Sequence, residues 1–181
     1  MIVPAYNESS RFDKYYWIKM IEIPNTRYIF VDDGSTDDTY KILSNLTQNS
    51  KSTVLQLPKN SGKSEAIRFG INHHLTEKHQ SSNGQRDLFG YIDADSAFNP
   101  EECSRIFNLA NSYLVENEGT KFRSLWTSRV KLRGRSIHRS TARHFIGRII
   151  HTIIGTFISD LPYDSQCGLK IFTYTYLKLV L

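Results

Sequence analysis

The chain has 181 residues, which is long enough for one domain with a sizeable hydrophobic core. Its 39% hydrophobic and 23% charged residues are typical of a soluble globular protein, and no run of about 18 apolar residues predicts a transmembrane helix within the chain. Two cysteines, Cys103 and Cys167, argue against a disulfide framework or zinc site, and the net charge of +5 favours an anionic partner such as nucleotide phosphate, nucleic acid or an acidic membrane face.

Apolar runs alternate with helical patterns in the order expected of βαβ units. Strands that alternate with helices of about ten or more residues predict a mostly parallel sheet, so the expected fold is α/β with a Rossmann-like sheet flanked by helices. The strands are expected at residues 2–5, 28–31, 53–57, 88–92 and 124–128. The helices are expected at residues 10–21, 37–46, 63–75 and 100–116.

A polar cluster follows each of the first four expected strands, at residues 6–8, 32–35, 60–63 and 93–95. In parallel α/β sheets, ligands bind beyond the carboxyl ends of the strands. Four clusters at corresponding places therefore predict one binding site along that edge of the sheet.

The second cluster, in the segment VDDGSTDDT, combines a strand end with a turn and a helix start. Gly34 permits a tight turn, and Ser35 or Thr36 is predicted to cap the next helix. Asp33 at the strand end can accept hydrogen bonds from a base or a sugar. A capping turn that binds no ligand is the alternative.

The third cluster, in the segment PKNSGKSEAIRFG, resembles a phosphate-binding P-loop only in part. That motif needs an additional glycine upstream of the Gly-Lys pair, and here only Gly62, Lys63 and Ser64 match, which disfavours a P-loop NTPase. A Gly-Lys pair at a helix N-terminus still suits an anion, and an ordinary capped helix is the alternative.

The fourth cluster, in the stretch YIDADSAFNP, contains Asp93 and Asp95. In an extended segment, side chains two residues apart point the same way. Two carboxylates suit Mg²⁺ or Mn²⁺, whose remaining ligands are substrate phosphates and water, whereas a pair of solvated carboxylates is the alternative. Ser96 and Asn99 are predicted to cap the helix that begins near Pro100.

The four segments IVPAYNE, VDDGSTDDT, NSGKSEAIRFGI and DADS resemble, in order and spacing, the successive motifs of the family 2 glycosyltransferases, which have a GT-A fold. The late segment YDSQCGLKIF, with TSR at residues 127–129, resembles the branch that transfers a hexose from a nucleotide sugar to a polyprenyl phosphate, and most of all its dolichyl-phosphate β-glucosyltransferases. The resemblance implies one catalytic domain over residues 1–181, with UDP-glucose as donor and Mg²⁺ or Mn²⁺ as cofactor. A GDP-mannose-dependent mannosyltransferase and a truncated nucleotide-sugar-binding domain without turnover are the alternatives.

The resemblance also implies roles for individual residues. The residues expected to contact the nucleotide sugar are Pro4, Ala5, Tyr6, Glu8, Asp33, Lys63 and Asp93. The residues expected at the reacting groups are Asp93, Asp95, Arg129, Arg143, Asp164 and Lys170. Among these, Asp95 is expected to bind the cation. The two arginines are expected to hold the acceptor phosphate, and Asp164 and Lys170 to lie near the sugar.

The segment RSIHRSTARHFIGRIIHTIIGTFI, residues 135–158, has two adjacent apolar stripes at helical spacing, with arginines and histidines on the other face. A basic amphipathic helix can lie in a membrane interface, and packing against the protein core is the alternative. With the resemblance, this pattern implies an enzyme at the cytosolic face of a membrane, which is the endoplasmic reticulum in a eukaryote or the plasma membrane in a bacterium.

Two further expectations concern partners and extent. The basic run at residues 123–148 lacks the interleaved aromatic residues of a base-stacking surface, so a nucleic acid is not expected as partner. The chain begins and ends abruptly next to strand-like segments, which is expected of a domain truncated at both ends. Relatives of this branch continue beyond the position of Lys170, so the resemblance implies that part of the acceptor site is missing.

Overall fold

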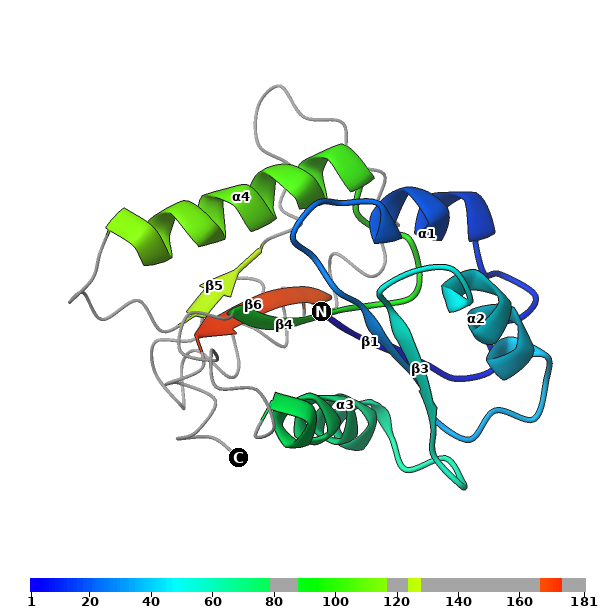
Figure 1. The fold of residues 1–181 in the computed structure, drawn as a ribbon. Helices are drawn as coiled ribbons and strands as arrows, with labels where there is room; N and C mark the ends of the chain where they lie inside the picture. The colour runs from blue at the N-terminus through cyan, green and yellow to red at the C-terminus, as the bar shows by residue number, and fades with distance from the viewer. Residues whose placement is uncertain (79–87, 117–123, 128–166, 174–181) are drawn as a thin grey trace, which may run out of the picture.

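The computed structural model describes residues 1–78, 88–116, 124–127 and 167–173. These residues form six strands in one sheet and four helices (Figure 1). The strands are β1 (Ile2–Ala5), β2 (Ile29–Asp32), β3 (Thr53–Gln56), β4 (Leu88–Ile92), β5 (Ser124–Trp126) and β6 (Leu169–Thr173). The helices are α1 (Lys14–Ile21), α2 (Thr39–Thr47), α3 (Lys63–Lys78) and α4 (Pro100–Glu116).

The strand order is β3-β2-β1-β4-β6-β5. Strands β3, β2, β1 and β4 are parallel neighbours, whereas β6 is antiparallel to both β4 and β5. The predicted mostly parallel α/β sheet is confirmed. Strand β6 was not predicted, because the segment around Lys170 was interpreted only as part of a functional motif. Its alternation of buried and half-buried residues is nevertheless the pattern of a strand.

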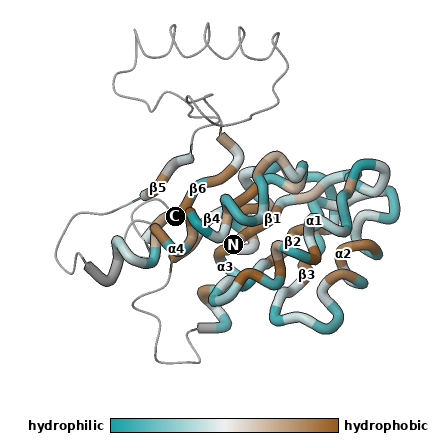
Figure 2. Tube along the Cα trace, turned by 90° about the horizontal axis from the view of Figure 1, so that it is seen from above, coloured by the Kyte–Doolittle hydropathy of each residue, from teal (hydrophilic) through white to brown (hydrophobic). Residues whose placement is uncertain are grey.

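Helices cover both faces of the sheet, so the described residues form three layers. Helix α3 lies on one face, and α1, α2 and α4 lie on the other (Figure 1). The larger core cluster joins Trp17 of α1, Leu43 of α2 and Cys103 of α4 to the strand side chains of Val3 and Phe30. Figure 2 shows hydrophobic stretches in the strands and alternating hydropathy along the helices, as expected when each helix buries one side.

Two helix starts differ from the prediction for local reasons. Helix α1 begins at Lys14, four residues later than expected, because the side chain of Asp13 caps it by accepting a hydrogen bond from the Tyr16 N–H at 3.0 Å. Helix α2 begins at Thr39, and the prediction that Ser35 or Thr36 caps it is wrong. The N-cap position is occupied by Asp38, and Ser35 and Thr36 instead form hydrogen bonds with Asn7 in the loop after β1.

The remaining described elements agree with the prediction to within three residues at each end. Within the described part of the chain, no helix combines the length and the apolar character needed to cross a membrane. The amphipathic helix predicted at residues 135–158 lies outside the described residues.

Candidate active site

Hydrogen bonds join the loops that follow β1 and β2 at the carboxyl edge of the sheet. The Asn7 N–H donates to the Ser35 hydroxyl oxygen at 2.9 Å, and the Thr36 N–H donates to the Asn7 side-chain carbonyl at 2.9 Å. Asn7 adopts a φ of 50°, a left-handed conformation that asparagine tolerates better than most residues. The first two polar clusters of the sequence are therefore one connected unit.

Asp37, in the loop after β2, also forms hydrogen bonds with the loop after β1. One of its carboxylate oxygens accepts hydrogen bonds from the Ser9 N–H and hydroxyl, at 3.1 and 2.6 Å, and the other accepts from the N–H and hydroxyl of Thr39. Desolvation acts to raise the pKa of Asp37, but these hydrogen bonds outweigh it and lower the pKa to about 2. The Thr39 hydroxyl also accepts from the Glu8 N–H at 2.8 Å.

Glu8, predicted to contact the nucleotide sugar, is buried and forms a two-pronged ion pair with Arg11. The Arg11 Nε and Nη2 groups donate to the two carboxylate oxygens at 2.5 and 2.6 Å. The pKa of Arg11 is raised, first by the hydrogen bond and charge of Glu8 and to a smaller extent by the charge of Asp95. Arg11 therefore binds Glu8 first of all and lies close enough to Asp95 to be affected by its charge.

Asp33 holds the loop that precedes helix α3. Its two carboxylate oxygens accept hydrogen bonds from the Ser61 and Gly62 N–H groups, each at 2.8 Å, and the residue is only 3% exposed. Gly34 makes this approach possible, since a Cβ atom there would lie 2.4 Å from the carbonyl carbon of Lys59. The contact between Asp33 and the nucleotide stays a prediction, and it would use the carboxylate's remaining lone pairs.

Lys63 and Asp93 form an ion pair between the start of α3 and the end of β4. The side chains are 48% and 26% exposed, so both are accessible to a ligand. The pair brings the third and fourth polar clusters of the sequence together at the carboxyl edge, as the strand-end pattern predicts.

The late motif packs directly against Asp93. The Asp93 N–H donates to the Gly168 carbonyl at 2.9 Å, and a Cβ atom on Gly168 would lie 2.4 Å from Asp93 Oδ2. The Thr127 hydroxyl donates to the Leu169 carbonyl at 2.8 Å and lies 3.0 Å from the sulfur of Cys167. Gly168 and Thr127 belong to segments that carry the resemblance, but neither was given a role from the sequence, because the effect of a missing side chain or of a hydroxyl between strands depends on the neighbouring atoms.

The acidic pair lies in a turn and not in an extended segment. Residues 94 and 95 form the turn, so the prediction that both carboxylates point the same way by strand alternation does not apply. The buried Trp17 Nε1 donates to the Ala94 carbonyl at 3.3 Å and fixes the turn from α1. Asp95 is exposed, and its carboxylate accepts from the Ala97 N–H at 3.2 Å.

The two predicted caps of α4 behave differently. Asn99 caps the helix, because its side-chain oxygen accepts from the Glu101 N–H at 2.9 Å. Ser96 does not, since it adopts a φ of 56° and its buried hydroxyl has no hydrogen-bond partner among the described residues.

The oxygen ligands available at this edge suit a hard divalent cation whose other ligands are water and substrate phosphates. Across the described ranges, no group of three or more His, Cys, Asp or Glu side chains could hold a metal ion by itself. Mg²⁺ in phosphate-transferring sites commonly uses one or two carboxylates, with substrate phosphates and water as the other ligands. The exposed carboxylate of Asp95 fits that pattern.

The other predicted residues divide into two groups. Pro4 and Ala5 lie at the end of β1, Tyr6 is 40% exposed in the following loop, and Lys170 lies in β6 opposite Tyr91. Arg129, Arg143 and Asp164 lie outside the described residues. The structure thus brings the residues predicted to contact the nucleotide sugar to one edge of the sheet.

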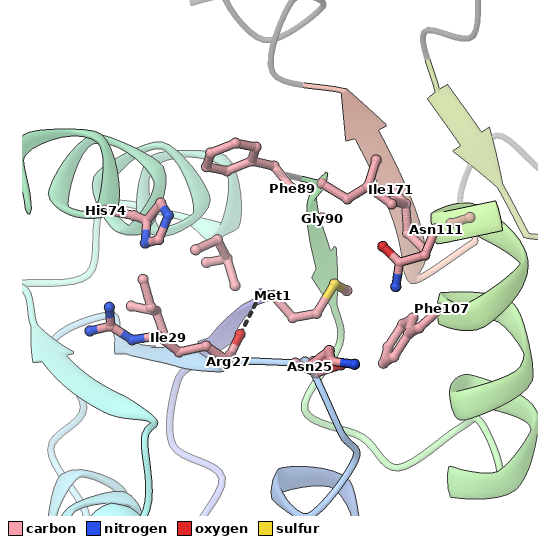
Figure 3. Close-up of a pocket in the computed structure, with 14 residues that line it drawn as sticks. Met1, Asn25, Arg27, Ile29, His74, Phe89, Gly90, Phe107, Asn111 and Ile171 are labelled. Atoms are coloured by element: carbon pink, nitrogen blue, oxygen red, sulfur yellow. Dashed lines mark hydrogen bonds between the residues drawn. The ribbon is translucent and has the colours of Figure 1, made fainter. Parts of the chain in front are cut away.

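A pocket between α3, α4 and the sheet lies at the opposite edge (Figure 3). It is lined by residues at the amino ends of the strands, including Ile2, Ile29 and Leu88, and by His74 and Phe107 of the two helices. None of the residues predicted to act on a ligand lines this pocket, so it is separate from the candidate site.

Comparisons with known proteins agree with this geometry. The family profile described as "Glycosyl transferase family 2" matches residues 1–157. A dolichyl-phosphate beta-glucosyltransferase of Trichomonas vaginalis, ALG5C, is 31% identical over 95% of the chain and 50% of its own length. The human dolichyl-phosphate beta-glucosyltransferase is 30% identical over 96% of the chain and 54% of its own length. The chain thus spans about half the length of these relatives.

Solved structures show the same architecture. The mannosyltransferase PcManGT from Pyrobaculum calidifontis, solved in complex with GDP-Man and Mn²⁺, superposes with a TM-score of 0.57 at 17% identity, over 99% of this chain and 45% of its own. The S. aureus TarS fragment 1–349 gives a TM-score of 0.57 at 21% identity, over 99% of this chain and 48% of its own. The likeness at this level of identity is one of fold, and the fold is GT-A. The chain belongs to the family 2 glycosyltransferases.

Proposed function

We propose that this chain carries the catalytic region of an inverting hexosyltransferase, which moves glucose from UDP-glucose to the phosphate of a dolichyl-type polyprenyl phosphate. The observation that carries this proposal is the contact between Gly168 and Asp93. It joins the late motif, which is typical of polyprenyl-phosphate transferases, to the acidic pair typical of the whole family. The relatives named above support the choice of glucose and of a dolichyl phosphate.

On the donor side, Pro4, Ala5 and Tyr6 form one wall for the nucleotide, and Lys63 and Asp93 face its diphosphate and sugar. A divalent cation held by Asp95 would neutralise the charge that develops on the departing diphosphate. The carboxylates of Glu8 and Asp33 are already engaged with Arg11 and with the loop before α3. Their main contribution on this proposal is to hold the walls of the site in place.

On the acceptor side, the nucleophile is a phosphate monoester. Its second pKa is about 6, so it is largely a dianion at neutral pH and needs no strong general base. It does need cations that bring it close to an anionic donor, and Arg129 and Arg143 are the proposed residues, since a guanidinium group can hold phosphate oxygens in a fork. Asp164 and Lys170 are proposed to lie on the sugar side.

Attack on the face opposite the diphosphate converts an α-linked donor into a β-linked product. The proposed place of reaction is the cytosolic surface of a membrane, where a lipid phosphate and a soluble nucleotide sugar can meet. The basic and apolar segment 135–158 is the proposed contact with lipid.

The test is a transfer assay with radiolabelled donor, dolichyl phosphate in detergent, and Mg²⁺ or Mn²⁺. We expect UDP-glucose to give a lipid-linked β-glucosyl phosphate, with loss of product in EDTA and in Asp95→Asn. Product formed from GDP-mannose and not from UDP-glucose would show that the donor is GDP-mannose and the transferred sugar is mannose. Nucleotide binding without transfer to any lipid phosphate would contradict the proposed transfer and favour a nucleotide-sugar-binding domain without turnover.

A further inference from the structure

Thr127 follows the last residue of β5 and has no assigned role in the proposed chemistry. Trp126 of β5 lies opposite Lys170 of β6 in the antiparallel register, so Thr127 lies beside Leu169, the first residue of β6. Thr127 is half-buried. It is therefore close to residues 167 and 168, which lead into β6.

The Thr127 side chain forms hydrogen bonds with residues on both sides of Gly168. Its hydroxyl group donates to the Leu169 carbonyl at 2.8 Å, and the Thr127 N–H donates to the same carbonyl at 3.3 Å. The hydroxyl oxygen also lies 3.0 Å from the Cys167 sulfur. Because a hydroxyl group has one proton, and that proton goes to the carbonyl, the Cys167 thiol is the donor in this second contact. Thr127 thus binds both chain neighbours of Gly168.

Gly168 in turn determines where the Asp93 carboxylate can lie. The Asp93 N–H donates to the Gly168 carbonyl at 2.9 Å, and a Cβ atom on Gly168 would lie 2.4 Å from Asp93 Oδ2. The other carboxylate oxygen, Oδ1, forms the ion pair with Lys63. The carboxylate is thus confined between the Lys63 ammonium group and the Gly168 backbone, and a shift of that backbone changes the space that is open to it.

Burial makes the Thr127 hydroxyl group difficult to replace. Cys167 and Leu169, its two partners, are both buried. A buried group that loses its hydrogen-bond partner destabilises the fold more than an exposed one, because water cannot take the partner's place. A valine side chain at position 127 has nearly the shape of threonine, but it neither donates to the Leu169 carbonyl nor accepts from the Cys167 thiol. A serine side chain can make both contacts.

We propose that Thr127 is a positioning residue, which acts through Gly168 to hold the Asp93 carboxylate in place for sugar transfer. This inference rests on the proposed function, in which Asp93 faces the diphosphate and the sugar of the donor. The Thr127 hydroxyl group fixes residues 167 and 169, these two residues fix the backbone of Gly168, and that backbone limits the movement of Asp93. Thr127 therefore needs no contact with the substrate to affect the reaction.

The experiment compares Thr127→Val with Thr127→Ser, which retains the hydroxyl group. Thr47→Val is the matched control, because the buried Thr47 hydroxyl also donates to a carbonyl, that of Leu43 at 3.1 Å, but does so within α2. Steady-state assays with UDP-glucose and dolichyl phosphate give kcat per folded molecule. We expect Thr127→Val to lower kcat by about 3- to 10-fold, because small displacements of a substrate-positioning group slow the reaction, and the other two variants to stay within about twofold of the wild type. Equal kcat values for Thr127→Val and Thr127→Ser would overturn the proposal.

A double substitution tests whether Thr127 acts through Gly168. In Gly168→Ala the added methyl group already displaces the Asp93 side chain, so the position of this backbone no longer controls the carboxylate. Thr127→Val in the Gly168→Ala background should therefore lower kcat by no more than about a further twofold, because two changes that act through the same contact are not additive. A further loss as large as that of Thr127→Val alone would show an independent effect and overturn the proposal.

Hydrogen exchange, measured by NMR, follows the Asp93 N–H group directly and needs no enzymatic activity. In the wild type we expect the Asp93 and Thr127 N–H groups to exchange through the same local opening, because they donate to the adjacent carbonyls of Gly168 and Leu169. Different opening free energies for these two groups would overturn the proposal even if no variant folds.

The same measurement on Thr127→Val separates the inference from the proposed function. Exchange of the Asp93 N–H should accelerate by about fivefold, which corresponds to about 1 kcal/mol, whereas the Asp33 N–H, which donates to the Ala5 carbonyl at 2.8 Å, should exchange as in the wild type. Unchanged exchange at Asp93 would overturn the inference. If exchange responds as expected but no nucleotide sugar is used, the proposed function fails and the positioning of Asp93 by Thr127 stands. If glucose is transferred equally by Thr127→Val and Thr127→Ser, the inference fails and the proposed function stands.

Discussion

Replacing Gly168 with alanine tests how the late motif acts on the acidic pair. The new Cβ would lie 2.4 Å from Asp93 Oδ2 and 2.8 Å from its Cγ, whereas ordinary contacts begin near 3.4 Å. About 1 Å must therefore be gained between the two residues. The hydrogen bond from the Asp93 N–H to the Gly168 carbonyl restrains both backbones, so the side chain of Asp93 is the part that is free to move.

The loss of stability depends on which interactions the Asp93 side chain loses when it moves. Overpacking against a rigid neighbour costs about 1–3 kcal/mol, but rotating the Asp93 carboxylate away sacrifices only its partly exposed ion pair with Lys63, worth about 0.2–1 kcal/mol. The carboxylate should therefore move, and the melting temperature should fall by no more than about 4 °C for a chain of this length. Displacement of a substrate-positioning group by about 1 Å can lower the transfer rate by about 100-fold.

The assay measures thermal unfolding and glucosyl transfer on the same preparations. Gly70→Ala is the matched control, because its Cβ would lie 2.9 Å from Ile2 Cγ2 in the core beneath α3, away from Asp93. It should lower stability and leave the transfer rate per folded molecule unchanged. Wild-type transfer by Gly168→Ala, or equal losses of transfer in both glycine variants, would refute the reasoning.

Two further substitutions test the connections between the loops. Asp33→Asn turns an amide donor toward one of the Ser61 and Gly62 N–H groups, so urea titration should show a free energy of unfolding that is lower by about 1–3 kcal/mol. The side chain of Asp38 makes no capping hydrogen bond, so the control Asp38→Asn should leave this free energy unchanged. Equal values for the two variants would contradict the role of Asp33. Desolvation opposes ionisation of Asp37, but the hydrogen bonds to its carboxylate outweigh it and lower the pKa to about 2. The ionised Asp37 therefore stabilises the fold fully above the ordinary pKa of 3.8, and this stabilisation is lost as the pH falls toward 2. Asp37→Asn should remove this part of the acid-unfolding curve measured by circular dichroism, and an unchanged curve would contradict the assignment.

The edge of the sheet that carries the site was predictable from local patterns. Polar residues directly follow the apolar strands, and parallel strands bring their carboxyl ends to one edge, so Lys63 and Asp93 were expected near each other and form an ion pair. The sequence order alone established this, because the rule depends on chain direction and not on any particular side-chain contact.

The partners of individual carboxylates were not predictable in the same way. Glu8 and Asp33 stay predicted contacts of the nucleotide sugar, but the sequence did not show that Glu8 also binds Arg11 and that Asp33 binds the backbone before α3. Such contacts depend on turns that bring loops together, and the left-handed φ of Asn7 is one of these turns. Strand β6 was missed for a related reason, since a motif interpreted for its chemistry also supplies the antiparallel partner of β4.

The proposed reaction depends on the recruitment, by Asp95, of a divalent cation to the diphosphate of a sugar nucleotide. The most direct measurement is calorimetric binding of UDP to the wild type and to Asp95→Asn, each with Mn²⁺ and with EDTA. We expect UDP to bind the wild type only weakly without the cation, Mn²⁺ to strengthen binding, and the substitution to abolish this gain. Equal affinity of the two proteins for UDP with Mn²⁺, or no effect of the cation on the wild type, would contradict it.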